Sequence, residues 1–170
     1  VYLVPGNHEE HGDFAKIVSE FSNLVNLDRK VAVVGEYVFL GYGGGGFSLE
    51  DPQFRKIARE WYGKYKGRKI VLVTHQPPYG TKLDILKKNL DGRNRWKHIG
   101  DDIYTKFDKK FQPLIHVCSH MHENQGYDKI GKTLVINTGA LLERRFVLLE
   151  LEKDKIKKLK FYNTLTRIIL

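Results

Sequence analysis

Runs of apolar residues, several of them uninterrupted, alternate along the chain with segments of helical periodicity. Residues 30–34 and 37–42 are separated by Gly35-Glu36, which predicts a β-hairpin. Uninterrupted apolar runs predict strands that are buried on both faces of a sheet, and the run at the start of the chain is one of them. The predicted strands cover residues 1–4, 30–34, 37–42, 70–73, 114–118, 133–137, 146–151 and 155–162.

Apolar residues spaced three or four positions apart predict three helices between these strands. The first begins at Asp13 as its N-cap and keeps its periodicity to residue 24. The second is opened by Asp51-Pro52 and ends near Gly67, and the third covers residues 101–112. Residues 87–98 are polar and predict an irregular segment. The alternation predicts one α/β domain over residues 1–170.

Potential metal ligands follow three of the apolar runs within a few residues. Asn7-His8 follows the first run, His75 follows residues 70–73, and His120 and His122 follow residues 114–118. In an extended segment His120 and His122 point to the same side, although two nearby histidines in a loop are more often solvated than bound to a metal. The carboxyl ends of parallel strands meet at one sheet edge, so these side chains are predicted to gather at a divalent metal.

These residues form ordered motifs, Gly6-Asn7-His8-Glu9, then His75, then Ser119-His120-Met121-His122. In this the chain resembles the calcineurin-like metallophosphoesterases, whose signature includes Gly-Asn-His-Asp/Glu, a lone histidine after a strand, and Gly-His-x-His. Residues 74–84 and 116–140 look like the small, single-domain, cyclic-phosphodiesterase-like branch. The resemblance implies a layered α/β/β/α sandwich, here without its N-terminal part.

The resemblance also implies roles for these residues in a metal-dependent phosphoesterase. Asn7, His75 and His120 would ligate one divalent ion of a two-metal centre, and His122 would ligate the other. His8 would face the phosphoryl group of a small-molecule or nucleotide substrate, a phosphodiester or phosphomonoester. Two such ions share a hydroxide that attacks phosphorus in line. These ligand types suit Mn, Fe, Zn or Ni without choosing among them.

The chain departs from the family signature in two ways. The Asp-x-His and Gly-Asp-x-x-Asp motifs, which precede Gly-Asn-His in the family, do not occur before Asn7. Because the chain also begins within a predicted strand, we expect it to be the C-terminal portion of a longer domain. Without those motifs the second ion keeps only His122, so a non-catalytic, metal-binding or structural remnant is the alternative. Ser119 replaces the usual glycine and would be strained if its φ were positive.

Composition adds several expectations. The net charge of +9 also allows nucleic-acid binding, although many of the lysines fall in residues 153–160, where they can protect an edge strand. One cysteine, Cys118, in an apolar run favours a reducing, cytoplasmic setting. No apolar run reaches membrane-spanning length. Abundant Lys, Ile and Tyr with few Gln is a feature of thermophilic proteins.

Four further residues and a glycine run carry weaker signals. His98 could line the substrate pocket, but a solvated or helix-capping position is expected, and His11 is expected at the surface. His116 lies within a predicted strand and should pack in the core. Glu9 should orient a neighbour rather than bind metal. Residues 43–46 lack the Lys-Ser/Thr of a P-loop, so they predict a loop with unusual backbone angles or a close contact.

Overall fold

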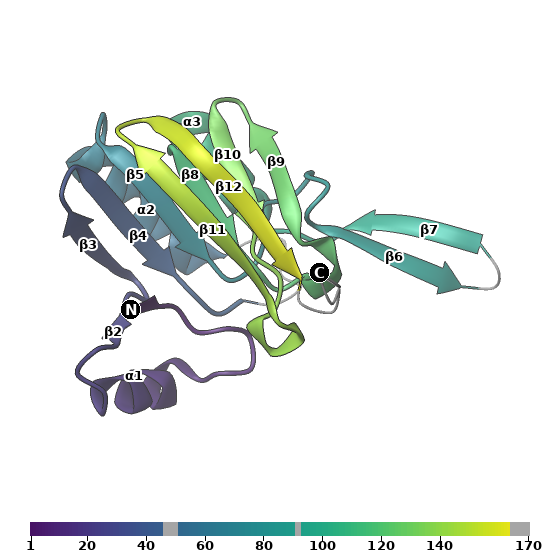
Figure 1. Cartoon of the computed structure of the whole chain (residues 1–170), viewed down its shortest axis with the longest axis horizontal. Helices are drawn as coiled ribbons and strands as arrows, with labels where there is room; N and C mark the ends of the chain where they lie inside the picture. Colours follow the sequence, from purple (N-terminus) through teal and green to yellow (C-terminus); the bar gives the residue numbers. More distant parts are fainter. Residues whose placement is uncertain (46–50, 91–92, 164–170) are drawn as a thin grey trace, which may run out of the picture.

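A six-stranded sheet forms the centre of the molecule (Figure 1). The computed structural model describes residues 1–45, 51–90 and 93–163. The strand order is β3-β4-β5-β8-β10-β9, with β4, β5, β8 and β10 mutually parallel and the two outer strands antiparallel to their neighbours. The strands are β3 (Lys30–Val34), β4 (Tyr37–Tyr42), β5 (Lys69–Thr74), β8 (Ile115–Cys118), β9 (Gly126–Ile130) and β10 (Thr133–Asn137).

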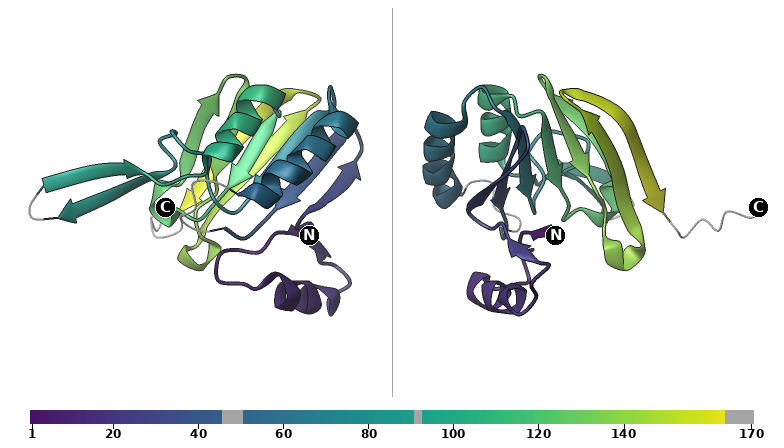
Figure 2. Two further views of the ribbon diagram at one scale, coloured as in Figure 1. Left: turned by 180° about the vertical axis from the view of Figure 1, so that it is seen from behind. Right: turned by 60° about the vertical axis from the view of Figure 1, so that its left-hand side comes forward.

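Helices cover one face of the sheet and a two-stranded ribbon covers the other (Figure 2). The helices are α2 (Pro52–Tyr65) and α3 (Asp102–Phe111), and Phe54, Trp61 and Phe107 bury their rings against the sheet. The ribbon consists of β11 (Arg145–Glu152) and β12 (Lys155–Asn163), and its inward-facing apolar residues pack on Val71 and Ile115. The predicted α/β class is therefore correct.

Three of the four expected layers are formed by the described residues: helices, central sheet and the β11–β12 ribbon. Within residues 1–45, 51–90 and 93–163, no helix covers the outer side of that ribbon (Figure 2). In the same residues, none of the helices is both long and apolar enough to cross a membrane.

The N-terminal segment differs from the prediction. Its strand, β1 (Tyr2–Leu3), pairs only with β2 (Val25–Asn26), outside the central sheet, and Val1 and Tyr2 are 71% and 43% exposed. The first helix, α1 (His11–Ser19), begins before Asp13 and ends before Phe21, and its predicted inner residue Ile17 is exposed. The predictions of a buried first strand and of a longer first helix were wrong, because the apolar side chains of this segment contact little of the core.

The segment predicted to be irregular forms a hairpin instead. Strands β6 (Ile85–Leu90) and β7 (Arg93–His98) pair antiparallel and project away from the body of the molecule (Figure 1). Strand β9 was also absent from the prediction. Two short 3₁₀ helices, η1 (His122–Asn124) and η2 (Leu141–Glu143), complete the described elements.

Candidate metal centre

Asn7, His75 and His120 meet at one end of the central sheet. The Asn7 Oδ1 lies 2.8 Å from the Nε2 of His75, and the same nitrogen lies 3.0 Å from the Nδ1 of His120. The two imidazole centroids are 4.8 Å apart. The predicted convergence of these three side chains is therefore observed, while their role as ligands stays a prediction.

Parallel pairing places the two histidine-bearing loops side by side. His75 follows β5 and His120 follows β8, and these strands are neighbours in the sheet. The backbone N–H of Ser119 donates to the carbonyl of His75 at 2.9 Å, which extends the strand pairing into the loops. Asn137, at the end of β10, donates through Nδ2 to the Met121 carbonyl at 2.8 Å and so holds the second loop.

The Asn7 segment is attached to the sheet through glycines that follow β4. The Gly44 N–H donates to the Pro5 carbonyl at 2.8 Å, and a Cβ at Gly43 would lie 2.3 Å from the Pro5 Cδ. Gly44 and Gly45 have φ values of 73° and 85°. Both features predicted for this glycine run, close contact and unusual backbone angles, are confirmed at positions 43–45, and Gly46 lies outside the described residues.

Backbone strain in the His120 loop falls on the histidine and not on Ser119. His120 has a φ of 64°, in the left-handed region, whereas Ser119 is not among the positive-φ residues. The Ser119 hydroxyl donates to the Gly139 carbonyl at 3.0 Å. The condition for strain at Ser119, a positive φ, is therefore not met, and the positive φ falls one position later.

A buried network supports the start of the His75 loop. Thr74 Oγ1 donates to the Gln76 carbonyl at 2.7 Å, so the His116 Nε2, 2.8 Å from the same hydroxyl oxygen, must donate to it. The His116 Nδ1 lies 2.7 Å from Asp108 Oδ2, and both side chains are fully buried. Burial raises the pKa of Asp108, while His116 opposes that rise. The prediction of a core position for His116 is confirmed.

His8 and His122 lie on the walls of the pocket into which the trio opens. The pocket has a volume of about 420 Å³ and is lined by Gly6, Asn7, His8, Glu9, His75, His120 and His122. The Nδ1 of His122 lies 3.1 Å from a carboxylate oxygen of Glu143, which leaves Nε2 as the nitrogen suited to a ligand. His8 is exposed, as a residue that meets a substrate must be.

Electrostatics keeps two of the imidazoles neutral. Burial, followed by the proximity of His120, His122 and His8, lowers the pKa of His75 to about 4. Burial and the neighbouring His122 also lower the pKa of His120 from its ordinary value of 6.5. A metal requires neutral imidazole, so both side chains are in the ligand-competent state at neutral pH.

The donor set fits one divalent ion. The Asn7 amide oxygen and the His120 Nδ1 lie 2.8 Å and 3.0 Å from the His75 Nε2, and an amide oxygen with neutral imidazoles suits borderline metals. In the part of the chain that the structure describes, no group of three or more His, Cys, Asp or Glu side chains is arranged to hold a metal. These residues therefore offer one three-donor site that includes an amide, and only His122 toward a second.

The other singled-out residues have structural partners. The His98 Nδ1 lies 2.8 Å from the buried Asp84, and its ring lies against Tyr79, so it neither is simply solvated nor caps a helix. His11, expected at the surface, is half-buried and lies 2.6 Å from Asp28. Glu9 accepts from the Gly6 N–H at 2.7 Å, consistent with the orienting role expected for it.

The sequence did not predict the residues that contact and orient the side chains and loops of the site. Glu143, beside His122, falls in a Leu-Leu-Glu-Arg-Arg segment with no recognisable motif. Asp28 accepts from the Gly43 N–H at 2.9 Å and also contacts His11 of α1, and so it connects α1 to the end of β4. Neither position carries a signal in a single sequence, because each acts through contacts distant along the chain.

Comparison with known proteins identifies the family. The family described as "Metallophosphoesterase, calcineurin superfamily" matches residues 1–161. An uncharacterized protein of Methanocaldococcus jannaschii is 32% identical over 145 residues, covering 81% of this chain and 62% of its own length. The human and mouse proteins named metallophosphoesterase domain-containing protein 1 are each 28% identical over 145 residues, covering 81% of this chain and 40% of theirs.

Solved structures agree on the fold. One superposes with a TM-score of 0.71 at 23% identity, covering 95% of this chain and 65% of the other. A crystal structure of a Thermus thermophilus protein superposes with a TM-score of 0.69 at 17% identity, covering 95% and 71%. The chain spans less than two thirds of the length of its curated relatives. With a family match over nearly its whole length, this chain belongs to the calcineurin superfamily of metallophosphoesterases.

Proposed function

We propose that this chain supplies part of the active site of a metal-dependent phosphoesterase. The observation that carries the proposal is the convergence of Asn7 and His120 on the Nε2 of His75, at 2.8 Å and 3.0 Å. These three residues hold one divalent ion, and His122 contributes to a second ion in a complete two-metal centre. Bound ions of this kind stabilise charge on phosphoryl oxygens and lower the pKa of a water molecule.

The protein's own groups position the substrate and move protons. His8 is exposed on the pocket wall and meets the phosphoryl group or protonates the leaving oxygen. Glu143 orients the imidazole of His122 through its Nδ1. The substrate is a phosphodiester or phosphomonoester of a small molecule or nucleotide, a class that a pocket of about 420 Å³ can accept.

Hydrolysis of an aryl phosphodiester with added MnCl₂ tests the proposal. We expect His8→Ala and His120→Ala to lower the rate by about a hundredfold or more. Asn7→Ala should weaken Mn²⁺ binding, measured by calorimetry, while Asn23→Ala, which changes an exposed asparagine outside the pocket, should not. Unchanged rates in both histidine variants of an active enzyme would refute the catalytic roles.

The second candidate function is that of a metal-binding domain without catalytic activity, and the small number of metal donors in the site favours it. The described residues offer one three-donor site, and the carboxylate among the pocket residues, Glu9, accepts from the Gly6 N–H. This alternative predicts at most one weakly bound ion per chain and no hydrolysis by the purified chain. Metal analysis that finds two tightly bound ions would eliminate it.

Three further expectations, on cellular setting, source and partner, accompany this proposal. A cytoplasmic setting is supported by the single, buried Cys118. A thermophilic source is supported only by the Lys-, Ile- and Tyr-rich composition. Nucleic acid as a partner is supported only by the net charge of +9, and it predicts an affinity that falls steeply with salt.

A further inference from the structure

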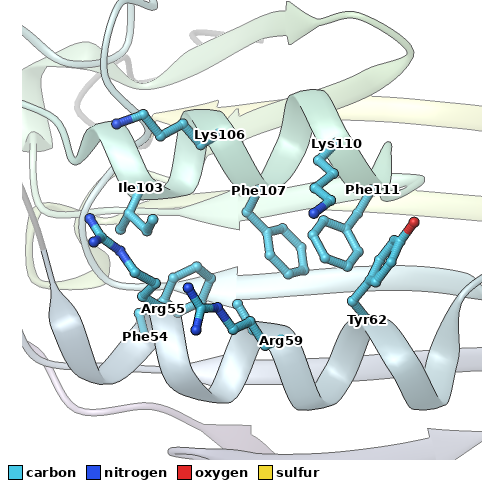
Figure 3. A pocket seen from close by; sticks show the side chains of 10 residues that line it. Phe54, Arg55, Arg59, Tyr62, Ile103, Lys106, Phe107, Lys110 and Phe111 are labelled. Carbon is cyan, nitrogen blue, oxygen red and sulfur yellow. The ribbon is translucent and has the colours of Figure 1, made fainter.

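A groove runs between α2 and α3 on the face of the helix layer that points away from the sheet (Figure 3). Its volume is about 210 Å³. Phe54, Ala58, Ile103, Phe107 and Phe111 line it, together with the ring of Tyr62. The groove belongs to helices, whereas the metal centre is built from loops at the strand ends, so the two sites are separate parts of the molecule.

The rim of the groove is cationic. Arg55 and Arg59 extend from α2, and Lys106 and Lys110 extend from α3, on the two sides of the aromatic residues (Figure 3). All four are exposed, and the ten lining residues, all within the described part of the chain, include no acidic side chain. Lys106 is paired with Asp102 of the same helix, which lies outside the groove lining. Lys110 places its Nζ 5.1 Å from the centre of the Tyr62 ring. The groove therefore combines an apolar floor with positive charge along both edges.

The aromatic rings in the groove are packed against one another. Phe107 and Phe111 are stacked with centroids 4.3 Å apart, and the rings of Tyr62 and Phe111 are nearly perpendicular with centroids 4.2 Å apart. Lys110 lies over the Tyr62 ring. Base stacking requires an open aromatic face. The packing instead suits the insertion of aliphatic or aromatic side chains from a partner, with carboxylates meeting the rim.

We propose that this groove binds an acidic amphipathic helix of a partner protein. Two neighbouring helices form a valley that accepts a third helix through apolar side chains three or four positions apart. Glutamate or aspartate beside those anchors would pair with Arg59 and Lys110 on opposite edges. The inference is independent of the phosphoesterase function, because neither the groove nor its rim contains a residue of the metal centre.

Fluorescence anisotropy with a labelled synthetic peptide tests this site. The probe is a helix-forming peptide of about 15 residues, with Leu at helical spacing and Glu flanking it. We expect Arg59→Glu/Lys110→Glu to weaken binding by about tenfold or more. The matched control, Lys129→Glu/Lys157→Glu, makes the same charge change on exposed strand residues and should leave the affinity within about twofold of wild type.

Two further probes decide between the groove and general charge attraction. A peptide of equal charge with Gln in place of Leu should bind about tenfold more weakly, because it lacks the apolar anchors. Equal binding of both peptides, or equal loss in both charge-reversal variants, would overturn the proposal. So would a thymidine oligonucleotide or a phosphatidylserine vesicle that binds more tightly than the Leu peptide and loses affinity in the Arg59→Glu/Lys110→Glu variant.

Discussion

Among the residues of the site, His75 has the most strongly shifted pKa. Burial and three neighbouring histidines lower the pKa of His75 to about 4, from 6.5. Between about pH 6.5 and pH 4 the unfolded chain therefore takes up a proton that the folded chain refuses. We predict that, in metal-free protein, the free energy of unfolding falls as the pH drops through this window, with no contribution from His75 above it.

Histidine NMR titration together with urea unfolding at several pH values measures this effect. The His75→Phe variant removes the titrating group and should flatten the part of the pH dependence that His75 contributes. A midpoint for His75 near 6.5 in the folded protein would contradict the expected burial.

His120 combines a proposed ligand with a left-handed backbone. At φ 64° a Cβ is unfavourable, and glycine avoids that cost. Both His120→Gly and His120→Ala remove the imidazole, so their difference reports the backbone alone. We predict that His120→Gly is more stable than His120→Ala by about 1 kcal/mol in urea unfolding. Equal stability, or a more stable alanine variant, would mean that the loop does not hold this conformation in solution.

Asp108 on α3 and His116 on β8 connect the helix layer to the sheet beneath it. Removing one partner leaves the other polar group buried without compensation. We predict that Asp108→Ala lowers the free energy of unfolding by about 3 kcal/mol. Asp102→Ala, in the same helix, removes only a partly exposed pair with Lys106 and should cost less than about 1 kcal/mol. Similar losses in the two variants would argue against the buried pair.

The contact between the end of β4 and the Asn7 segment depends on the absence of a side chain at Gly43. An alanine Cβ there would lie 2.3 Å from the Pro5 Cδ and 2.5 Å from its carbonyl oxygen. We predict that Gly43→Ala displaces this segment, destabilises the fold by about 1–3 kcal/mol and weakens Mn²⁺ binding.

Gly63, in the interior of α2, provides the matched control, because a Cβ there meets nothing within 4 Å. Gly63→Ala should stabilise the protein by about 0.5–1 kcal/mol and leave Mn²⁺ binding unchanged. Calorimetric titration and urea unfolding of both variants give the comparison. Wild-type metal binding in Gly43→Ala would show that the Pro5 contact does not position Asn7.

Among the helices and strands, the sequence best predicts those whose residues pack in the core. The runs that became β5, β8 and β10 are continuous and apolar because helices cover one of their faces and the ribbon covers the other. The β6–β7 hairpin escaped prediction because its sequence lacks the alternation of apolar and polar residues that marks a half-buried strand. The N-terminal segment misled in the opposite way, since its apolar side chains are partly exposed.

The residues of the site also differ in how well the sequence predicted them. His75 and His120 could be placed together because each follows an apolar run, and those two runs are parallel neighbours in the sheet. Asn7 also follows an apolar run, but that run lies outside the central sheet, and the Gly44–Pro5 hydrogen bond brings its segment to the site. Glu143 and the Asp108–His116 pair could not be placed, because their partners are decided by packing between layers. The sequence therefore indicated which side chains meet, but not what orients them.

For the whole molecule, membership of the metallophosphoesterase family is shown over residues 1–161, while the hydrolytic activity stays a proposal. The relatives exceed this chain in length, the Methanocaldococcus jannaschii protein by the smaller margin and the mammalian proteins by the larger.

The three side chains that meet at the sheet end come from distant parts of the sequence. Asn7 and His75 are 68 residues apart, and His75 and His120 are 45 apart. A bound ion would therefore act as a removable cross-link that closes two long loops, much as a disulfide does. We predict that Mn²⁺ raises the melting temperature and protects the amides of α1 and β1 from hydrogen exchange, and that a chelator reverses both effects. In Asn7→Ala the ion would still bridge β5 and β8, but it would no longer hold the first thirty or so residues against the sheet.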